Sequence, residues 1–329
     1  MKKKAKWLAG AAAAGAAGAV LEYLLARYFT RRTLIRGNAK TERTQKMAGT
    51  DWSVYIPMIQ EARAKIEQNP CEDVFVTAED GVKLHGRYFP CKGSDRVALC
   101  FHGYTGEGLS DYACMAEHYY EQGFSLMCVD ERAHGKSEGT YIGFGCLDRH
   151  DAEQWIKYLI ERNGENCEIL LHGVSMGGAT VLMTSGLDLP KQVKAIISDC
   201  AFTSAWDVFS SVLKTTYHLP AFPLMHLSDQ MARRKAGYGL RECNALDEVK
   251  KSHVPTLFIH GDRDTFVPCS MVYELYEACA APKELLIVEG ASHAESYYKD
   301  PEKYWTAVKS WIDRYFETRQ DKERKEEQE

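Results

Sequence analysis

Six short apolar runs, mostly separated by stretches with helical periodicity, constrain the fold of this 329-residue chain more than any other feature. The runs are "RVALCFHG", "FSLMCVDE", "EILLHGVS", "VKAIISDC", "TLFIHGDR" and "ELLIVEGA". Strands that are apolar on both faces are typical of parallel sheets, because crossover helices cover each face. The order therefore predicts an α/β fold with a mainly parallel central sheet and helices on both faces.

Two strand-like segments and a helix are expected before the six runs. "DVFVTAED" and "VKLHGRYF" flank Asp80 and Gly81, a pair that is typical of a hairpin turn. Apolar residues recur at helical spacing between Pro57 and Pro70, which predicts an amphipathic helix packed on the main domain.

Composition excludes several classes of partner and site. The net charge is −5 and there is no stripe of basic residues interleaved with aromatics, so nucleic acid is not an expected partner. The eleven cysteines include no Cys-x-x-Cys pair, and Cys100, Cys128 and Cys200 belong to apolar runs. We therefore expect buried thiols, with no metal site and no cofactor.

The N-terminal segment, residues 1–30, is hydrophobic and has basic flanks. Its uncharged run from Trp7 to Leu21 is shorter than the roughly 20 residues that a spanning helix needs. Three interpretations remain open: a signal anchor that continues through Phe29, a cleaved signal peptide, and a helix lying on a membrane surface. We expect membrane association through residues 7–29, on a side left open; a cytoplasmic or secreted protein is the alternative.

The stretch "EILLHGVSMGGAT" places a serine on a very tight turn between an apolar run and a helical pattern. Gly173 and Gly177 permit an abrupt strand-to-helix reversal that projects Ser175 from the corner. The N–H groups that begin the helix would then point towards an oxyanion beside the serine. An ordinary glycine-rich turn is the alternative, and the motif alone is a weak signal.

Other strand ends supply the groups that a serine nucleophile needs. Glycines in "HGYTGEG" would turn the backbone N–H of Tyr104 towards the serine. "FIHGDRDTFVP" supplies Asp262 and Asp264, and "EGASHAES" supplies His293. A serine hydroxyl needs an imidazole to take its proton, and that imidazole needs a carboxylate to orient it. The chain carries all three, in the order Ser, Asp, His.

With these motifs, the region from about residue 73 to residue 315 resembles the α/β-hydrolase superfamily, near its bacterial monoacylglycerol-lipase-like and serine-aminopeptidase-like members. The resemblance implies Ser175 as the nucleophile, Asp264 as the orienting acid and His293 as the general base. It also implies an oxyanion hole formed by the backbone N–H groups of Tyr104 and Met176.

One position departs from the family pattern, and several residues compete for the assigned roles. In "ERAHGKSEG", Ala133 replaces the glycine usual in relatives, which we expect to alter only a local turn. Asp262 and Asp199 are the alternative acids; the family spacing before Val-Pro favours Asp264, and Asp262 is expected to bond within its loop. The remaining histidines near strand ends are expected to be structural: His102, His134, His172 and His260.

The resemblance further implies a small helical cap at about residues 203–245, inserted in a hydrolase domain of residues 71–317. Trp206, Phe209, Leu213 and Tyr217 recur on one helical face, and Trp206 and Phe209 would line a substrate pocket there, with ordinary packing as the alternative. Residues 31–70 are expected to form a linker and the amphipathic helix, and residues 318–329 a charged tail.

The expected function is hydrolysis of a carboxylic ester or related acyl bond in a small-molecule substrate, through an acyl-enzyme on Ser175. Amide, peptide and thioester hydrolysis use the same groups and remain alternatives. A binding protein that keeps the fold without turnover is the alternative from another class.

Overall fold

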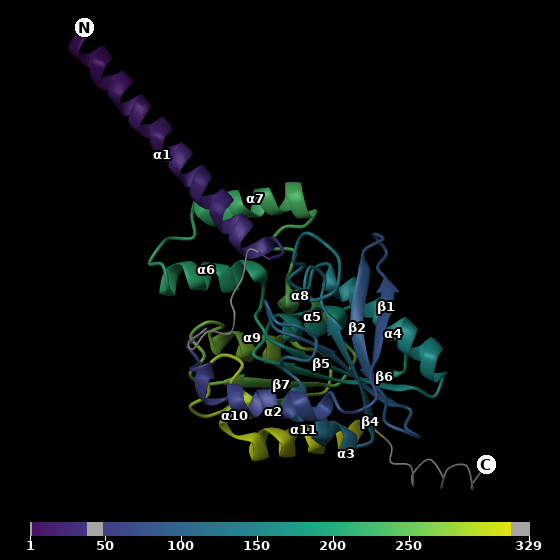
Figure 1. Cartoon of the computed structure of the whole chain (residues 1–329). Coiled ribbons are helices and arrows are strands. Elements are labelled where there is room, and N and C mark those ends of the chain that lie inside the picture. The colour runs from purple at the N-terminus through teal and green to yellow at the C-terminus, as the bar shows by residue number, and fades with distance from the viewer. Residues whose placement is uncertain (1, 38–48, 317–329) are drawn as a thin grey trace.

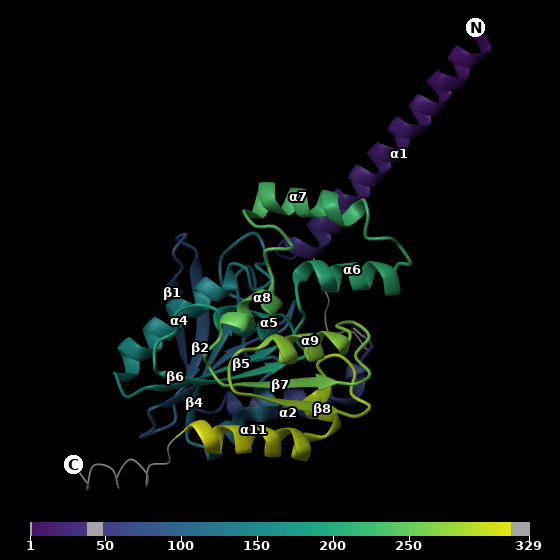
Figure 2. The same ribbon diagram turned by 180° about the vertical axis from the view of Figure 1, so that it is seen from behind.

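The computed structural model describes residues 2–37 and 49–316, and an eight-stranded sheet forms its centre (Figure 1; Figure 2). The strands are β1 (Glu72–Thr77), β2 (Lys83–Phe89), β3 (Arg96–Phe101), β4 (Phe124–Asp130), β5 (Glu168–Val174), β6 (Val193–Asp199), β7 (Thr256–Gly261) and β8 (Lys283–Val288). Their order across the sheet is β1-β2-β4-β3-β5-β6-β7-β8.

Strands β3 to β8 run parallel, while β1 and β2 form an antiparallel hairpin at one edge. Gly81 in the hairpin turn has a φ of 84°, a conformation that glycine adopts without strain. The six parallel strands are the six apolar runs, so the predicted mainly parallel sheet and its hairpin are confirmed. Their carboxyl ends meet at one edge: Phe101 pairs with Gly173, and Val174 pairs with Asp199.

Helices cover both faces of the sheet, as predicted (Figure 1; Figure 2). One face carries α2, α3 and α11, and the other carries α4, α5 and α9. The helices are α1 (Lys2–Leu34), α2 (Ile56–Ile66), α3 (Ala116–Glu121), α4 (Asp148–Asn163), α5 (Met176–Thr184), α6 (Ala205–Thr215), α7 (Leu224–Ala236), α8 (Ala245–Glu248), α9 (Ser270–Ala278), α10 (Ser296–Lys299) and α11 (Pro301–Tyr315), with short 3-10 helices η1 (Trp52–Val54), η2 (Ala113–Met115) and η3 (Val249–Lys251).

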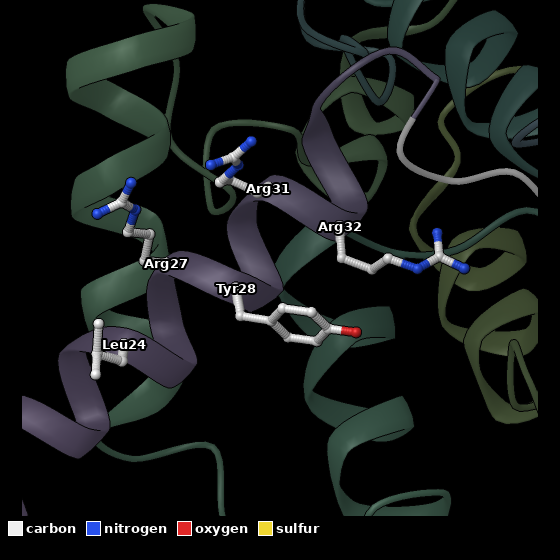
Figure 3. Close-up of a pocket in the computed structure, with 5 residues that line it drawn as sticks. All are labelled: Leu24, Arg27, Tyr28, Arg31 and Arg32. Atoms are coloured by element: carbon white, nitrogen blue, oxygen red, sulfur yellow. The ribbon is translucent and has the colours of Figure 1, made fainter.

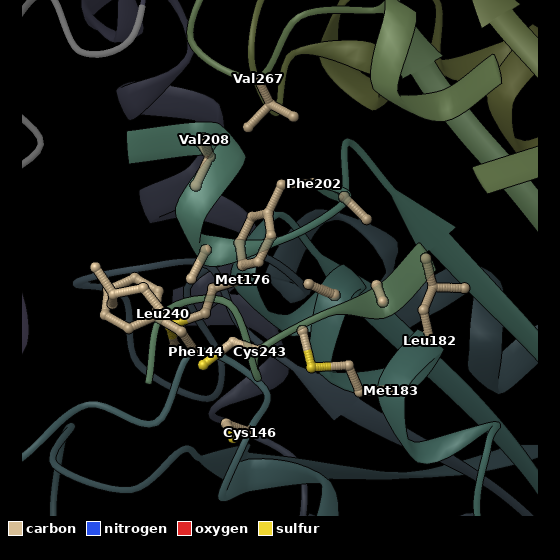
Figure 4. Close-up of a cluster of buried hydrophobic side chains, with 14 of the residues drawn as sticks. Phe144, Cys146, Met176, Leu182, Met183, Phe202, Val208, Leu240, Cys243 and Val267 are labelled. Carbon is tan, nitrogen blue, oxygen red and sulfur yellow. The ribbon is translucent and has the colours of Figure 1, made fainter. Parts of the chain in front are cut away.

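Helices α6 and α7 form a separate layer over the domain, where the cap was expected (Figure 1). The base of this layer continues into a buried apolar cluster that includes Met176, Phe144 and Val208 (Figure 4). Phe209 and Leu213 are buried on the inner face of α6. Tyr217 was expected on the same helical face, but α6 ends at Thr215 and the Tyr217 side chain is 60% exposed.

Helix α1 crosses the expected boundary at residue 30 without a break. Its N-terminal part projects away from the domain beyond α7, and its C-terminal part packs on the cap (Figure 1; Figure 2). Ala26, Thr30 and Leu34 are buried because they recur on the one side of the helix that faces the protein. Residues 31–36, expected to be linker, are therefore part of the packed structure. Residues 38–48 and the tail at 318–329 lie outside the described residues.

No helix in the described part of the chain is both long enough and apolar enough to cross a membrane.

Candidate active site

Ser175 occupies a strained turn between β5 and α5. Its φ of 56° and ψ of −111° are unusual for a residue with a side chain. A Cβ atom at Gly173 would lie 2.0 Å from the carbonyl oxygen of Gly177, and one at Gly177 would lie 2.0 Å from the carbonyl oxygen of Phe101. Both glycines are therefore required by contact between backbones, which is the steric condition for an exposed nucleophile at this corner.

Ser175, His293 and Asp264 form one hydrogen-bonded chain. Ser175 Oγ lies 2.8 Å from His293 Nε2, and His293 Nδ1 lies 2.7 Å from Asp264 Oδ2. The second carboxylate oxygen, Asp264 Oδ1, accepts the backbone N–H groups of Phe266 and Val267, each at 2.9 Å. The carboxylate is thereby fixed in position, and it orients the imidazole towards the serine.

The electrostatics of this chain favour a polarised imidazole. Burial opposes the charged form of His293, but the Asp264 carboxylate outweighs that effect and raises the pKa of His293 above its ordinary value of 6.5. Burial likewise opposes ionisation of Asp264, yet His293 and His260 hold the pKa of that carboxyl well below its usual range. Asp264 is therefore ionised whenever His293 accepts a proton.

Two backbone N–H groups are available beside the serine. Gly103 precedes Tyr104 in the loop after β3, and a Cβ atom on Gly103 would lie 3.5 Å from the Ser175 Cβ atom. Met176 follows the serine at the start of α5. Among the described residues, neither the Tyr104 nor the Met176 N–H group has an acceptor in the protein. An oxyanion formed on a carbonyl bound at Ser175 would supply that acceptor.

The competing carboxylates take other partners. Asp262 was expected to bond within its own loop, but Asp262 Oδ1 accepts the backbone N–H of Gly290 at 2.6 Å and so holds the loop after β8. Asp199 accepts the Ser296 hydroxyl at 3.3 Å, and burial raises the pKa of its carboxyl to about 6. Of the three candidate acids, Asp264 is the one bonded to His293.

The four other histidines near strand ends are held by structural contacts. His102 Nε2 accepts the Glu131 N–H at 3.0 Å, and His134 Nε2 accepts the Thr105 N–H at 3.3 Å. His172 lies between the hydroxyls of Tyr119 and Tyr304, and His260 Nε2 donates to the Val267 carbonyl. None of the four hydrogen-bonds to Ser175 within the described structure.

Ala133, the departure from the family pattern, lies in a left-handed turn with a φ of 62°. Its N–H donates to the Glu138 carbonyl at 2.9 Å, so the turn closes with alanine in a conformation that favours glycine.

The two expected pocket residues lie in different surroundings. The Phe209 ring packs edge-on against Phe144 at 5.0 Å and against Phe29 at 5.6 Å, in the same buried cluster as Met176. The Arg241 guanidinium lies 3.5 Å from the Trp206 ring centroid, a cation–π contact. Phe209 is therefore a buried member of the apolar cluster that contains Met176, and Trp206 packs against the same cluster while it remains partly exposed.

Contacts from the N-terminal region were missed by the sequence reasoning. The Tyr104 hydroxyl donates to the Thr33 carbonyl at 2.9 Å, and the Thr50 hydroxyl donates to the His293 carbonyl at 2.8 Å. The helical spacing of Ala26, Thr30 and Leu34 was the one sequence signal that α1 has a face directed into the protein.

A hollow of about 460 Å³ lies beside α1 (Figure 3). It is lined by Leu24, Arg27, Tyr28, Arg31 and Arg32.

Comparisons with known proteins agree with this geometry. Residues 93–236, which contain the loop after β3 and the Ser175 turn, match the family described as serine aminopeptidase S33. A Bacillus subtilis protein, YqkD, is 29% identical over 233 residues, which cover 71% of this chain and 76% of that protein. Escherichia coli YfhR is 26% identical, with 69% of this chain and 74% of the relative covered.

Solved structures of esterases are also similar to this chain. A Pyrococcus furiosus esterase is 25% identical with a TM-score of 0.63, over 77% of this chain and 94% of the esterase. An acetyl xylan esterase from Paenibacillus is 17% identical with a TM-score of 0.59 over 80% of this chain and 95% of its own, a likeness of fold. Together with the strand order and the Ser175 turn, these matches show that the chain has the α/β-hydrolase fold.

Proposed function

We propose that this α/β hydrolase cleaves a carboxylic ester through an acyl-enzyme on Ser175. The observation that carries the proposal is the continuous chain from Ser175 Oγ through His293 to Asp264, with contacts of 2.8 and 2.7 Å. A nucleophile, a base and an orienting acid in hydrogen-bond reach are what acyl transfer requires. The Pyrococcus furiosus relative is an esterase, which supports an ester in preference to other acyl compounds.

The proposed reaction uses only groups of this chain and water. His293 takes the Ser175 proton as the oxygen attacks the carbonyl carbon, and the Tyr104 and Met176 N–H groups stabilise the oxyanion by about 3 kcal/mol per donor. His293 then donates the proton to the leaving alkoxide, and the acyl-enzyme forms. A water molecule repeats the sequence, with His293 as base, and releases the acid.

A fluorophosphonate probe tests whether Ser175 is the nucleophile. A set of substrates tests which type of acyl bond the enzyme cleaves. We expect one adduct, located on Ser175 by mass spectrometry, and its loss in Ser175→Ala. Hydrolysis rates for an ester, a thioester and an anilide with the same acyl group would rank the three reactions, with the ester fastest. Folded wild-type protein without an adduct would favour the binding-protein alternative, and a faster anilide would favour an amidase or peptidase.

We also propose that the projecting part of α1 attaches the enzyme to a membrane. Large hydrophobic side chains between residues 20 and 28 are exposed: Val20, Leu21, Tyr23, Leu24, Leu25 and Tyr28. Arg27, Arg31 and Arg32 lie beside them, and anionic lipid headgroups would complement their charge (Figure 3). The combination of exposed apolar and basic side chains supports an attachment surface.

Substitution tests this attachment better than deletion, because removing residues 1–30 would also remove the buried Ala26 and Thr30. Leu21→Ser combined with Leu24→Ser should lower the fraction of the protein that sediments with membranes. Phe75→Ser, which changes a similarly exposed residue on β1, is the matched control. Equal sedimentation of both variants and the wild type would contradict the attachment.

A further inference from the structure

The backbone and the side chain of Tyr104 contact different parts of the protein. Its backbone N–H is the expected oxyanion donor, while its side chain extends to the C-terminal end of α1. There the hydroxyl lies 2.9 Å from the Thr33 carbonyl oxygen and 3.4 Å from the Arg32 carbonyl oxygen. The shorter contact is the main hydrogen bond. Burial raises the pKa of Tyr104, so the hydroxyl keeps its proton and remains a donor.

The acceptors are groups that a helix leaves unsatisfied. The last four carbonyls of an α-helix have no partner within the helix, and they carry the negative end of its dipole. In α1, Thr33 receives the Tyr104 hydroxyl and Leu34 receives the backbone N–H of Ile142 at 2.9 Å. The Tyr104 hydroxyl therefore helps to satisfy the C-terminal carbonyl groups of α1, a helix that is distant from Tyr104 in sequence.

The end of α1 is itself firmly held, so it can serve as a fixed point. The Leu34 side chain is 1% exposed, and Ile35 forms a β-bridge with Tyr141. The Arg36 N–H donates to the Thr140 carbonyl at 2.9 Å. These contacts join α1 to the segment before α4, which is part of the main domain.

The loop that carries Tyr104 needs such a fixed point. Gly103 and Gly106 flank it, and Thr105 has a φ of 63°. On the main-domain side, the Gly103 N–H donates to Asp111 Oδ2 at 2.8 Å. On the opposite side, the Tyr104 ring packs on Phe144 at 5.4 Å and the hydroxyl reaches α1. The oxyanion N–H thus lies between two anchors.

We propose that the Tyr104 side chain is a positioning group that uses the end of α1 to hold the Tyr104 backbone N–H in the oxyanion hole. This inference rests on the proposed esterase function. It makes the N-terminal helix a component of the active site in addition to any role in attachment. The hydroxyl acts through the backbone and touches no substrate.

Tyr104→Phe tests the proposal because it removes the hydroxyl and keeps the ring and the N–H. We expect kcat for a short, soluble p-nitrophenyl ester to fall about five- to tenfold, with KM unchanged, as for the loss of one buried hydrogen bond. Affinity for phenylboronic acid, whose serine adduct places an oxygen in the oxyanion hole, should fall by a similar factor.

Tyr88→Phe is the matched control, because its buried ring also carries a hydroxyl that is bonded, at 3.2 Å, to Asn163 at the C-terminal end of α4. It should leave kcat and boronate affinity unchanged. Wild-type kinetics in Tyr104→Phe, or equal losses in both variants, would overturn the positioning role while the esterase function stands. A wild-type enzyme without fluorophosphonate labelling would instead overturn the proposed function, and this inference with it.

Discussion

The site has two supports that differ in kind. On the sheet side, Ser175, Asp264 and His293 each follow a parallel strand, and close backbone contacts at Gly173 and Gly177 leave no space for a side chain in the serine turn. On the α1 side, a single helix contacts the Tyr104 loop through the Tyr104 hydroxyl and packs on α6 through Phe29. The sheet side leaves the backbone of the serine turn no alternative conformation. The α1 side adjusts the position of the Tyr104 loop in a site that the sheet has already formed.

The largest expected effect comes from the chemistry that the sheet side holds. Ser175→Ala, His293→Ala and Asp264→Asn should each lower kcat/KM for an ester by about 10⁴-fold or more, because the three groups act as a unit. The double variant Ser175→Ala, His293→Ala should be no slower than either single variant. Losses that multiply in the double variant would show that the two residues act independently. Steady-state kinetics with active-site titration measures both.

Gly177→Ala should destabilise the fold by about 3 kcal/mol or more, since its Cβ atom would lie 2.0 Å from the Phe101 carbonyl oxygen. Gly18→Ala on α1 is the control, because a Cβ atom there has nothing within 4 Å. Urea unfolding measures the change in the free energy of unfolding. Equal changes in the free energy of unfolding for Gly177→Ala and Gly18→Ala would show that the serine turn is no more sterically restricted than α1.

Leu34→Ala weakens the packing of α1 on the protein and leaves the sheet unchanged. Because the side chain is 1% exposed, we expect a loss of about 2–4 kcal/mol in the free energy of unfolding. Leu24→Ala, on the exposed side of the same helix at 51% exposure, should change it by less than about 0.5 kcal/mol. A Leu34 variant as stable as the Leu24 variant would show that α1 is not part of the core.

The pH profile depends on the sheet side alone. His293 must be neutral to accept the serine proton, and its pKa is raised above 6.5. Activity should therefore be full at high pH and be lost as pH falls through that raised value, about tenfold for each further pH unit. Tyr104→Phe should keep the same midpoint of kcat/KM against pH. A wild-type midpoint below 6.5 would contradict the Asp264 effect.

The smallest expected effect is at Ala133. Replacing this residue by glycine relieves a φ of 62° but also increases the entropy of the unfolded chain, so we expect a net gain of about 0.5 kcal/mol. Thermal unfolding measures it, with the ester kinetics expected to stay unchanged. A destabilised variant would mean that packing of the Ala133 methyl group outweighs the relief of strain.

Local patterns predicted the sheet side and missed the α1 side for a physical reason. Each parallel strand is a largely apolar run, and the serine turn needs glycines within two residues, so a short window of sequence carries the information. The bond between Tyr104 and Thr33 joins residues 71 positions apart and uses a backbone acceptor, which any residue type could supply. Tyr217 was misplaced because helical spacing continues past the point where α6 ends.

Because α1 is one continuous helix, it is expected to behave as a rigid rod. With 33 residues and no kink-forming proline, it is about 50 Å long, and it leaves the domain from the cap side (Figure 1). A rigid rod transmits direction as well as position. If the projecting end is attached as proposed, the attachment would also set the tilt of the enzyme, with α6 and α7 turned towards the point of attachment and the face covered by α2 and α11 pointing away.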